Sequence, residues 1–288
     1  MTIKSILAPL DGSDSSENAL RAALTMAGQC GAHVDALHVR TNPKDAVPLL
    51  GEGMSGAVIE DIIVAAERES NERAHNARSV FDKVCESQGV TIVDEPPSDE
   101  EISARWVEET GREDEATGLR GRLADLIVLP RPTPESSVSA TMTLNAALVE
   151  TGRAVLVVPE GQQESIGRRI AISWNGSAEA ARAVAAALPL IEKADRVLVL
   201  TIDGDEAPAK VTSELSDYLL WHGVSTDMDV SPVTDRQVGE TVLSKCADWN
   251  ADLLVMGAYT HSRLRQLIMG GVTSYVLSEA TLPVVMVN

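Results

Sequence analysis

ILAPLDGSDSSENALRAAL (residues 6–24) and IAISWNGSAEAARAVAAAL (170–188) are two copies of one pattern, and this repeat decides the fold. The two stretches share an apolar start, a Gly-Ser pair (12–13 and 176–177) and a closing Ala-Ala-Leu. In each, a short apolar segment leads through Gly-Ser into an alanine-rich amphipathic segment. This order is typical of a strand followed by a helix with a serine N-cap. The chain therefore contains one β-α unit twice.

Two further pairs of matched strands extend the repeat over the whole chain. ADLIVLP (124–130) matches ADLLVMG (251–257), and AVLVVP (154–159) matches PVVMVN (283–288). Each is short, apolar and rich in β-branched residues, as expected for a parallel sheet with helices on both faces. The alternation of strands and helices predicts an α/β fold with two tandem, doubly wound, parallel five-stranded sheets.

The element boundaries follow from the same patterns. A polar linker, PEGQQESIG (159–167), divides the chain into domains 1–160 and 161–288. The first domain is longer because residues 41–88 add a loop and a helix, predicted over 57–87 from its apolar stripe. In the second domain we predict strands at 170–174, 196–202, 224–230, 252–256 and 283–287, with helices at 177–192, 207–222, 237–249 and 272–280.

The last strand of each unit is apolar and lies at the edge of its sheet. An unpaired edge invites association with another strand. We therefore predict that 154–158 pairs with 283–287 and joins the two domains as a pseudo-two-fold pair. Assembly of two whole chains into a further homodimer is left open.

The composition of the 288 residues is that of a soluble globular protein, with 44% hydrophobic and 23% charged residues. The formal net charge of −19 predicts repulsion of nucleic acids and anionic membranes. No apolar run reaches the ~20 residues of a membrane span, and the opening MTIKSILAPLDGS is not a secretory signal. Three cysteines without a CxxC pair favour the cytoplasm. The acidic stretch 94–115 is interpreted as solvated surface.

A glycine pattern lies near the end of the second unit. GAYT (257–260) follows the apolar strand LLVM, and GGVT (270–273) precedes a helix. Glycines between a strand and a helix let backbone N–H groups approach an anion closely. Together with LDGS (10–13) and the order of the elements, this pattern resembles a tandem universal stress protein. The resemblance covers nearly the whole chain and implies the adenine nucleotide alpha hydrolase-like (HUP) fold.

The resemblance also implies an adenine nucleotide, such as ATP or AMP, with Mg2+ as its companion ion. In nucleotide-binding members of this family the glycine pattern holds the phosphates and the ribose. The ends of the first two strands hold the nucleoside. Carried over to the second domain, the resemblance implies a site formed by Asn175, Gly176, Ile202, Gly257, Thr260, Gly270, Gly271, Val272 and Thr273.

The second domain departs from the family pattern at three positions. Thr260 replaces a glycine, at a cost of ~1 kcal/mol or more where a positive φ is required. Gly271 replaces a hydroxyl residue, which the nearby Thr273 is placed to supply, and Asn175 replaces an aspartate and loses its charge. The loop between the glycines carries three basic residues, His261, Arg263 and Arg265. They either offset phosphate charge or are solvated loop charges.

The first domain keeps the positions for the nucleoside but lacks the glycine pattern for the phosphates. It keeps Asp11 after its first strand and Val39 at the end of its second, the two positions that hold a nucleoside in the family. However, LPRPTPESSVSATMTLN (129–145) contains no glycine where the phosphate cradle is expected. Its prolines also lack backbone N–H donors. We therefore expect no phosphate cradle in the first domain.

Three hypotheses for the function follow. The first is a regulatory adenine-nucleotide binder in the stress response, whose ligand tunes dimerisation or contacts with a protein partner. The second is a scaffold in which both nucleotide sites have decayed. The third is a weak ATP hydrolase, which ranks last because no Walker A motif, HExxH or nucleophile elbow is present. No catalytic or metal-binding residue is assigned.

Overall fold

The structure is a computed structural model that describes residues 2–42, 56–95, 102–202, 208–232, 238–258 and 271–288. The first domain contains β1 (Ser5–Pro9), α1 (Asp14–Cys30), β2 (His33–Arg40), α2 (Gly56–Gln88), β3 (Thr91–Ile92), β4 (Ser103–Thr110), α3 (Glu113–Gly121), β5 (Leu126–Pro130), α4 (Val138–Glu150) and β6 (Ala154–Val158).

The second domain repeats this order without a counterpart of β3. Its elements are β7 (Arg169–Ser173), α5 (Ala178–Ile191), β8 (Arg196–Ile202), α6 (Pro208–Trp221), β9 (Thr226–Ser231), α7 (Val238–Trp249), β10 (Leu253–Gly257), α8 (Gly271–Glu279) and β11 (Val284–Val287). Every predicted element of this domain is present, and its ends lie within two residues of the prediction.

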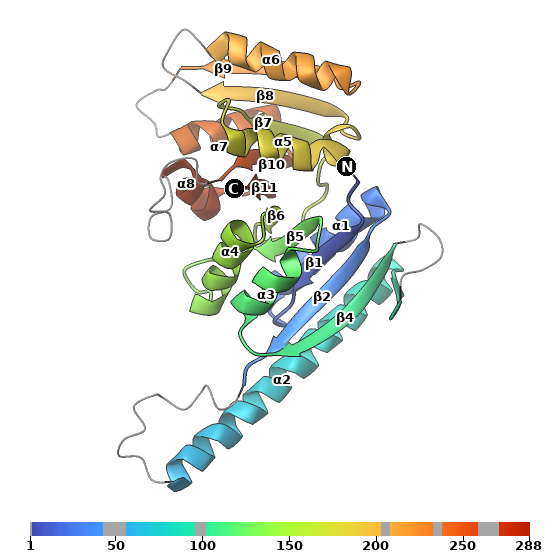
Figure 1. Ribbon diagram of the computed structural model, residues 1–288, viewed down its shortest axis with the longest axis vertical. Coiled ribbons are helices and arrows are strands. Elements are labelled where there is room, and N and C mark those ends of the chain that lie inside the picture. Colours follow the sequence, from blue (N-terminus) through green and yellow to red (C-terminus); the bar gives the residue numbers. More distant parts are fainter. Residues whose placement is uncertain (1, 43–55, 96–101, 203–207, 233–237, 259–270) are drawn as a thin grey trace.

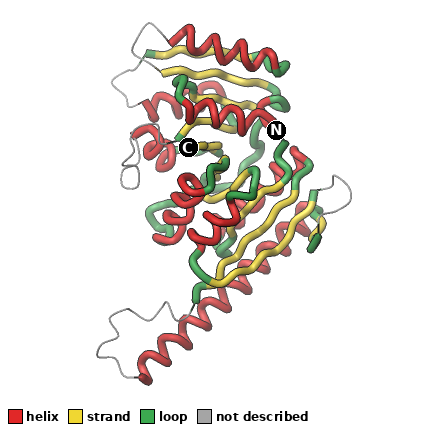
Figure 2. The backbone as a smooth tube through the Cα atoms, viewed as in Figure 1, coloured by secondary structure: helices red, strands yellow, loops and turns green. Residues whose placement is uncertain are grey.

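The described strands form one continuous sheet in the order β3-β4-β2-β1-β5-β6-β11-β10-β7-β8-β9 (Figures 1 and 2). Within each domain all neighbouring strands are parallel. The predicted tandem, doubly wound α/β fold is therefore confirmed. The first-domain sheet differs from the five-stranded expectation by one additional two-residue strand, β3.

Hydrophobic residues fill two layers, one on each face of the sheet. The first layer lies under α1, α2, α5 and α6, and the second lies under α3, α4, α7 and α8. Successive residues of a strand alternate between the layers: on β10, Leu253 and Val255 join the first, whereas Leu254 and Met256 join the second. The apolar β-branched strands are thus buried on both faces, as their sequences predict.

The first helix of each domain begins at its predicted serine cap. Ser13 Oγ accepts a hydrogen bond from Ser16 N, and Ser177 Oγ accepts one from Ala180 N, each at 3.2 Å. These bonds satisfy N–H groups that have no partner within the helix. Helix α1 ends at Gly31 in the left-handed conformation, with φ 61°.

The helix predicted over 57–87 is confirmed as α2, but it is no insertion: it occupies the place of α6 in the second domain and has 33 residues where α6 has 14. Its second half packs on the first layer through Phe81 and Val84, both fully buried. Its first half extends past the sheet (Figure 1), where Val58 and Val64 are 44% and 59% exposed. None of the described helices, α2 included, has the length and hydropathy of a membrane span.

The acidic stretch 94–115 differs in part from the expected solvated surface. Residues 103–110 form β4, which pairs with β2 along its whole length, from His33 opposite Ser103 to Arg40 opposite Thr110. On this strand Glu108 is exposed, whereas the adjacent Glu109 is half-buried and accepts a hydrogen bond from Arg120, so composition alone does not show which carboxylates are fully solvated.

The junction between the domains is the strand pair that the repeat predicts. β6 and β11 are antiparallel, with Val157, Leu156 and Val155 opposite Val284, Val285 and Met286. Leu156 and Val285 are fully buried in the first hydrophobic layer. This confirms the edge-to-edge pairing of 154–158 with 283–287 and makes the two sheets one.

Candidate functional site

Three of the second-domain candidate residues, Asn175, Gly176 and Gly257, lie where β7 and β10 end. The two strands are parallel neighbours, with Met256 opposite Ser173, and the chain leaves them in opposite directions, to β8 and to β11. Such a switch point at the carboxyl ends of parallel strands is where open α/β sheets bind ligands. Asn175 follows β7, and Gly257 ends β10.

The turn after β7 is built by two of the candidate residues. Asn175 Oδ1 accepts a hydrogen bond from Ser177 N at 3.1 Å, and Gly176 has φ +70°, which favours glycine. Ile202 is the last residue of β8 and is half-buried. The neighbouring Trp174 donates its indole N–H to Val211 O at 3.0 Å and packs against the first hydrophobic layer, so its ring is a structural part of the domain.

Packing against helix α5 is enough to require a glycine at position 257. A Cβ at this position would lie 2.6 Å from Ala180 N and 2.7 Å from the carbonyl carbon of Glu179, both in the first turn of α5. The close approach of strand and helix therefore excludes a side chain. Retention of this glycine is explained by the fold, whether or not an anion binds beside it.

The remaining second-domain candidates divide between helix α8 and the part of the chain that is not described. Thr260 and Gly270, with the loop residues between them, lie outside the described residues. Gly271 begins α8, and among the described residues no atom outside its chain neighbours and its own helix lies within 4 Å of an ideal Cβ there. Val272 packs on the second hydrophobic layer, whereas Thr273 is only 5% exposed, so its hydroxyl faces the domain interior.

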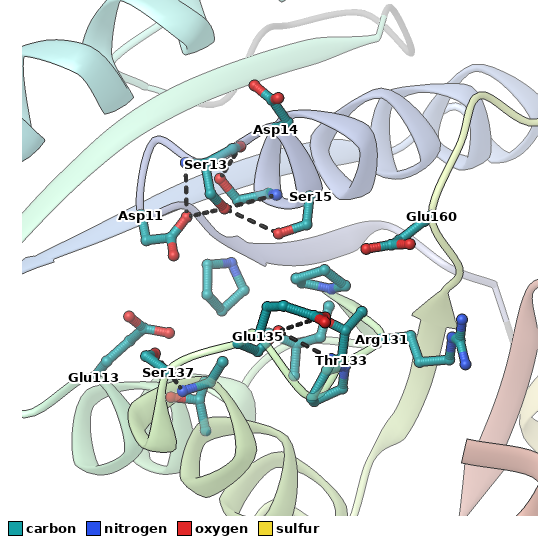
Figure 3. A pocket seen from close by; sticks show the side chains of 18 of the residues that line it. Asp11, Ser13, Asp14, Ser15, Glu113, Arg131, Thr133, Glu135, Ser137 and Glu160 are labelled. Atoms are coloured by element: carbon teal, nitrogen blue, oxygen red, sulfur yellow. Dashed lines mark hydrogen bonds between the residues drawn. The ribbon is translucent and has the colours of Figure 1, made fainter. Parts of the chain in front are cut away.

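A second concave site lies in the first domain, at the carboxyl ends of β1 and β5. The pocket there has a volume of about 410 Å³ and is lined by the turn after β1, the start of α3, the loop 131–137 and the linker after β6 (Figure 3). This volume lies within the usual range of small-molecule sites. Asp11 lines the pocket; Val39 is not among its lining residues and is 9% exposed in the second hydrophobic layer.

The proline-rich loop of the first domain forms one wall of this pocket. Thr133 N donates to Ser136 Oγ at 2.9 Å, and Ser137 Oγ then accepts from Ala140 N at 3.2 Å as the N-cap of α4. The backbone donors of the loop are thus used within it, while Pro132 has no N–H to offer. The loop closes on itself with hydroxyl groups instead of opening as a glycine cradle.

Two carboxyl groups with opposite pKa shifts face each other in the pocket (Figure 3). Partial burial raises the pKa of Asp11, but hydrogen bonds led by those of Ser13 outweigh it and hold the pKa below 3.8. Ser13 N and Oγ donate to Asp11 Oδ1 at 2.9 Å and 2.6 Å. Burial raises the pKa of Glu113, and the charge of Asp11 raises it further, against the opposing effects of Thr143 and Arg73. Asp11 is therefore the more readily ionised of the two.

Sequence reasoning missed several residues of this pocket. Glu113 belongs to an acidic run that is interpreted as solvated, Arg73 comes from the long helix α2, and Glu160 comes from the linker. They reach the pocket from three distant segments, so no local motif joins them. The signal available in the sequence was Asp11 alone. Among the described residues, no group of three His, Cys, Asp or Glu side chains could hold a metal ion.

The geometry defines a tandem α/β protein with a pocket at the carboxyl ends of β1 and β5 and a strand switch point between β7 and β10. The model of the universal stress protein family matches residues 2–155 and 167–288. The chain therefore belongs to the universal stress protein family, with two tandem units, as the sequence resemblance predicts.

Some of the solved structures with this fold match nearly the whole chain. A universal stress protein from Archaeoglobus fulgidus DSM 4304 superposes with a TM-score of 0.70 at 15% identity, covering 99% of this chain and 98% of that one. A putative universal stress protein from Pseudomonas aeruginosa UCBPP-PA14 gives a TM-score of 0.59 at 13% identity, with 99% and 93% covered. At these identities the likeness shows the fold alone. No curated protein matches the sequence.

Proposed function

We propose that the protein is a regulatory adenine-nucleotide binder of the stress response that binds ATP or AMP through its second domain. The observation that supports this most directly is the position of Asn175 and Gly257 at the switch point between β7 and β10, together with the start of the next helix, α8, at Gly271. In the proposed complex the side-chain amide of Asn175, just after β7, forms a hydrogen bond with a hydroxyl group of the nucleoside.

The start of α8 supports the phosphate half of this proposal. The first N–H groups of a helix have no partner within it, and the helix dipole favours a negative charge there. Gly271 carries no side chain here, and no described residue of another element lies within 4 Å of a Cβ built on it. A phosphate group at this point would meet backbone donors without a side chain in the way.

The test is a titration of the full chain with ATP, ADP and AMP, with and without Mg2+, in which the melting temperature is measured at each nucleotide concentration. Gly271→Asp places a negative charge where the phosphate is expected, and Gly271→Asn is its uncharged control of similar shape. Asp at a helix start is favourable, so this variant is expected to fold. We expect ligand to raise the melting temperature of the wild type, and the aspartate variant to bind at least about tenfold more weakly than the asparagine variant.

A flat response of the wild type up to millimolar nucleotide would overturn the proposal. That result would favour the scaffold hypothesis, in which the shape formed by the β6–β11 strand pair is the functional feature of the protein. Equal binding by the two Gly271 variants would overturn the placement of the phosphate at α8.

A further inference from the structure

The sheet ends at β9, whose outer edge pairs with no other strand of the described chain. β9 pairs with β8 along its six residues and is the last strand in the sheet order. Figure 1 shows β9 and α6 at one end of the molecule and the long helix α2 at the other. An edge strand presents a row of backbone N–H and C=O groups without partners, and this row fits another extended strand.

Apolar side chains are exposed beside this edge, on the face of β9 that carries α6. Thr226 Oγ1 donates to Ser216 Oγ of α6 at 2.9 Å. Met228 and Val230 follow Thr226 at every second position, so they lie on the same face, where they are 57% and 43% exposed. Leu220 lies one helical turn beyond Ser216 on the same side of α6 and is 62% exposed. Helix α6 therefore leaves the outer side of β9 uncovered.

The two carboxylates on the other face of β9 are each bound to a cation of the same chain. Arg196 donates a hydrogen bond to Asp227. Lys245 Nζ donates to Asp229 Oδ2 at 2.8 Å. Burial raises the pKa of Asp229, but hydrogen bonds from Lys245 and Ser231 and the charge of Lys245 hold this pKa below 3.8. Both acidic side chains of β9 are therefore neutralised, although the whole chain has a net charge of −19.

The position of α6 fits a second copy of the same edge. The helix packs on β8 and β9 alike, and Thr212 Oγ1 of α6 donates to Thr201 Oγ1 of β8 at 2.8 Å. Neighbouring strands are about 4.8 Å apart, so two α6 helices on either side of a β9–β9 pair would lie two spacings, or about 10 Å, from each other. Packed helices have interaxial distances of about 8–10 Å. Pairing of two β9 edges would thus bring the helices into contact and cover Leu220.

The junction between the domains shows the same arrangement within one chain. There β6 and β11 pair as antiparallel edge strands. Helix α1 packs on β5 and β6, and α5 packs on β10 and β11, so a helix flanks the pair on each side. A β9–β9 pair flanked by two α6 helices would repeat this arrangement between two chains.

We propose that two copies of this chain associate through β9, as an antiparallel strand pair on a two-fold axis. Such an axis brings the same surface of both chains together, so the exposed apolar side chains of one copy meet those of the other. The partner is therefore a second copy of this protein, and the proposed dimer forms one sheet that runs through both chains.

The sequence of β9 favours one register for this pair. With Met228 opposite Met228 of the second copy, residues 226–230 are paired throughout. Asp227 then lies opposite Asp229. Like charges opposite each other destabilise a strand pair, but here each carboxylate keeps the cation already bound to it. A shift by two residues towards the end of β9 would bring Pro232 into the pair, and proline has no N–H to donate.

The test is sedimentation velocity of the full chain over a concentration series. The series extends to about 100 µM, so that it includes interfaces of micromolar affinity. Salt at about 0.15 M screens the repulsion between the two acidic surfaces. We expect a reversible dimer, and we expect Val230→Lys, which puts a charge beside the edge, to weaken it at least about tenfold. Because Val230 is exposed, this variant is expected to fold.

Val149→Lys is the matched control, since this valine on α4 of the first domain is 42% exposed and the change adds the same charge. We expect the control to dimerise like the wild type. Equal weakening by Val149→Lys and Val230→Lys would place the interface elsewhere and overturn the proposal. A monomer throughout the concentration series would overturn it as well.

Met228→Cys tests the register through a disulfide bond formed with dissolved oxygen as the oxidant. In the proposed register the two Cα atoms at position 228 lie about 4.5–5.5 Å apart, which a disulfide spans. Val230→Cys is the control, because the two copies of position 230 are four residues apart, or about 13 Å. The native cysteines are buried or half-buried, so the wild type gives the background. We expect Met228→Cys to cross-link faster, and equal rates would overturn the proposed pairing.

Discussion

Replacing Gly257 with alanine tests whether the fold alone explains this glycine. The new Cβ would lie 2.6 Å from Ala180 N, whereas ordinary van der Waals contacts begin near 3.4 Å. Backbone atoms cannot rotate aside, so the first turn of α5 must move by several tenths of an ångström. Overpacking of this kind costs about 1–3 kcal/mol of folding free energy.

The same movement weakens the helix cap. Ala180 N is the donor in the bond to Ser177 Oγ, and loss of such a cap costs about 1 kcal/mol. Against this, alanine restricts the unfolded chain more than glycine does, which stabilises by about 0.4–1 kcal/mol. We expect Gly257→Ala to lower the free energy of unfolding by about 2–3 kcal/mol, the balance of these effects.

Urea unfolding followed by tryptophan fluorescence measures the change, because Trp174 lies close to the affected turn. The control is Gly271→Ala, a glycine of the same domain with open space around its Cβ. We expect this control to be neutral, or more stable by up to about 1 kcal/mol as the first residue of a helix. If Gly257→Ala is as stable as Gly271→Ala, the packing argument is refuted.

Two further predictions concern the sheet. Burial raises the pKa of Asp35, but hydrogen bonds from His33 and Arg105 and the charge of Arg105 lower it to about 2. This pKa lies below the unfolded value, so the ionised carboxylate stabilises the fold fully above pH ~4, and this stabilisation is lost as the pH falls towards 2. Asp35→Asn should therefore lower the free energy of unfolding by about 1–2 kcal/mol at neutral pH. Urea unfolding should show a smaller difference between the variant and the wild type at pH ~3. At the junction between the domains, Leu156→Ala and Val285→Ala should each lower the free energy of unfolding by about 2–4 kcal/mol. The double variant should lose less than the sum, because the two side chains lie opposite each other. Strict additivity in a double-mutant cycle would contradict this.

The fold could be predicted in most of its detail because the sequence contains the same pattern of strands and helices twice. Strand 196–202 was predicted to the residue, and helix α2 was placed within one residue at each end. Apolar runs that repeat in the same order leave few alternatives. The pairing of β6 with β11 followed from the need to cover two apolar edges. β3 was missed because two residues carry no periodic signal.

The candidate sites were harder to predict. The Asp11 turn was visible as a strand-to-helix junction, but the pocket around it depends on Glu113, Arg73 and Glu160, which are far apart in the sequence. A run of carboxylates looks the same in sequence whether it faces water or a cavity. In the second domain, Asn175 and Gly257 lie at the ends of the neighbouring strands β7 and β10, as the order of parallel strands predicts, whereas the nucleotide site itself stays a prediction.

The bond from Arg131 to Ser278 ties the rim of the first-domain pocket to helix α8 of the second domain. Arg131 directly follows β5, and its backbone N–H also donates to Val158 O at the end of β6, the strand that pairs with β11. The two domains are therefore joined by a side-chain bond as well as by the strand pair. Anything bound in that pocket would lie beside a residue that helps to hold the domains together.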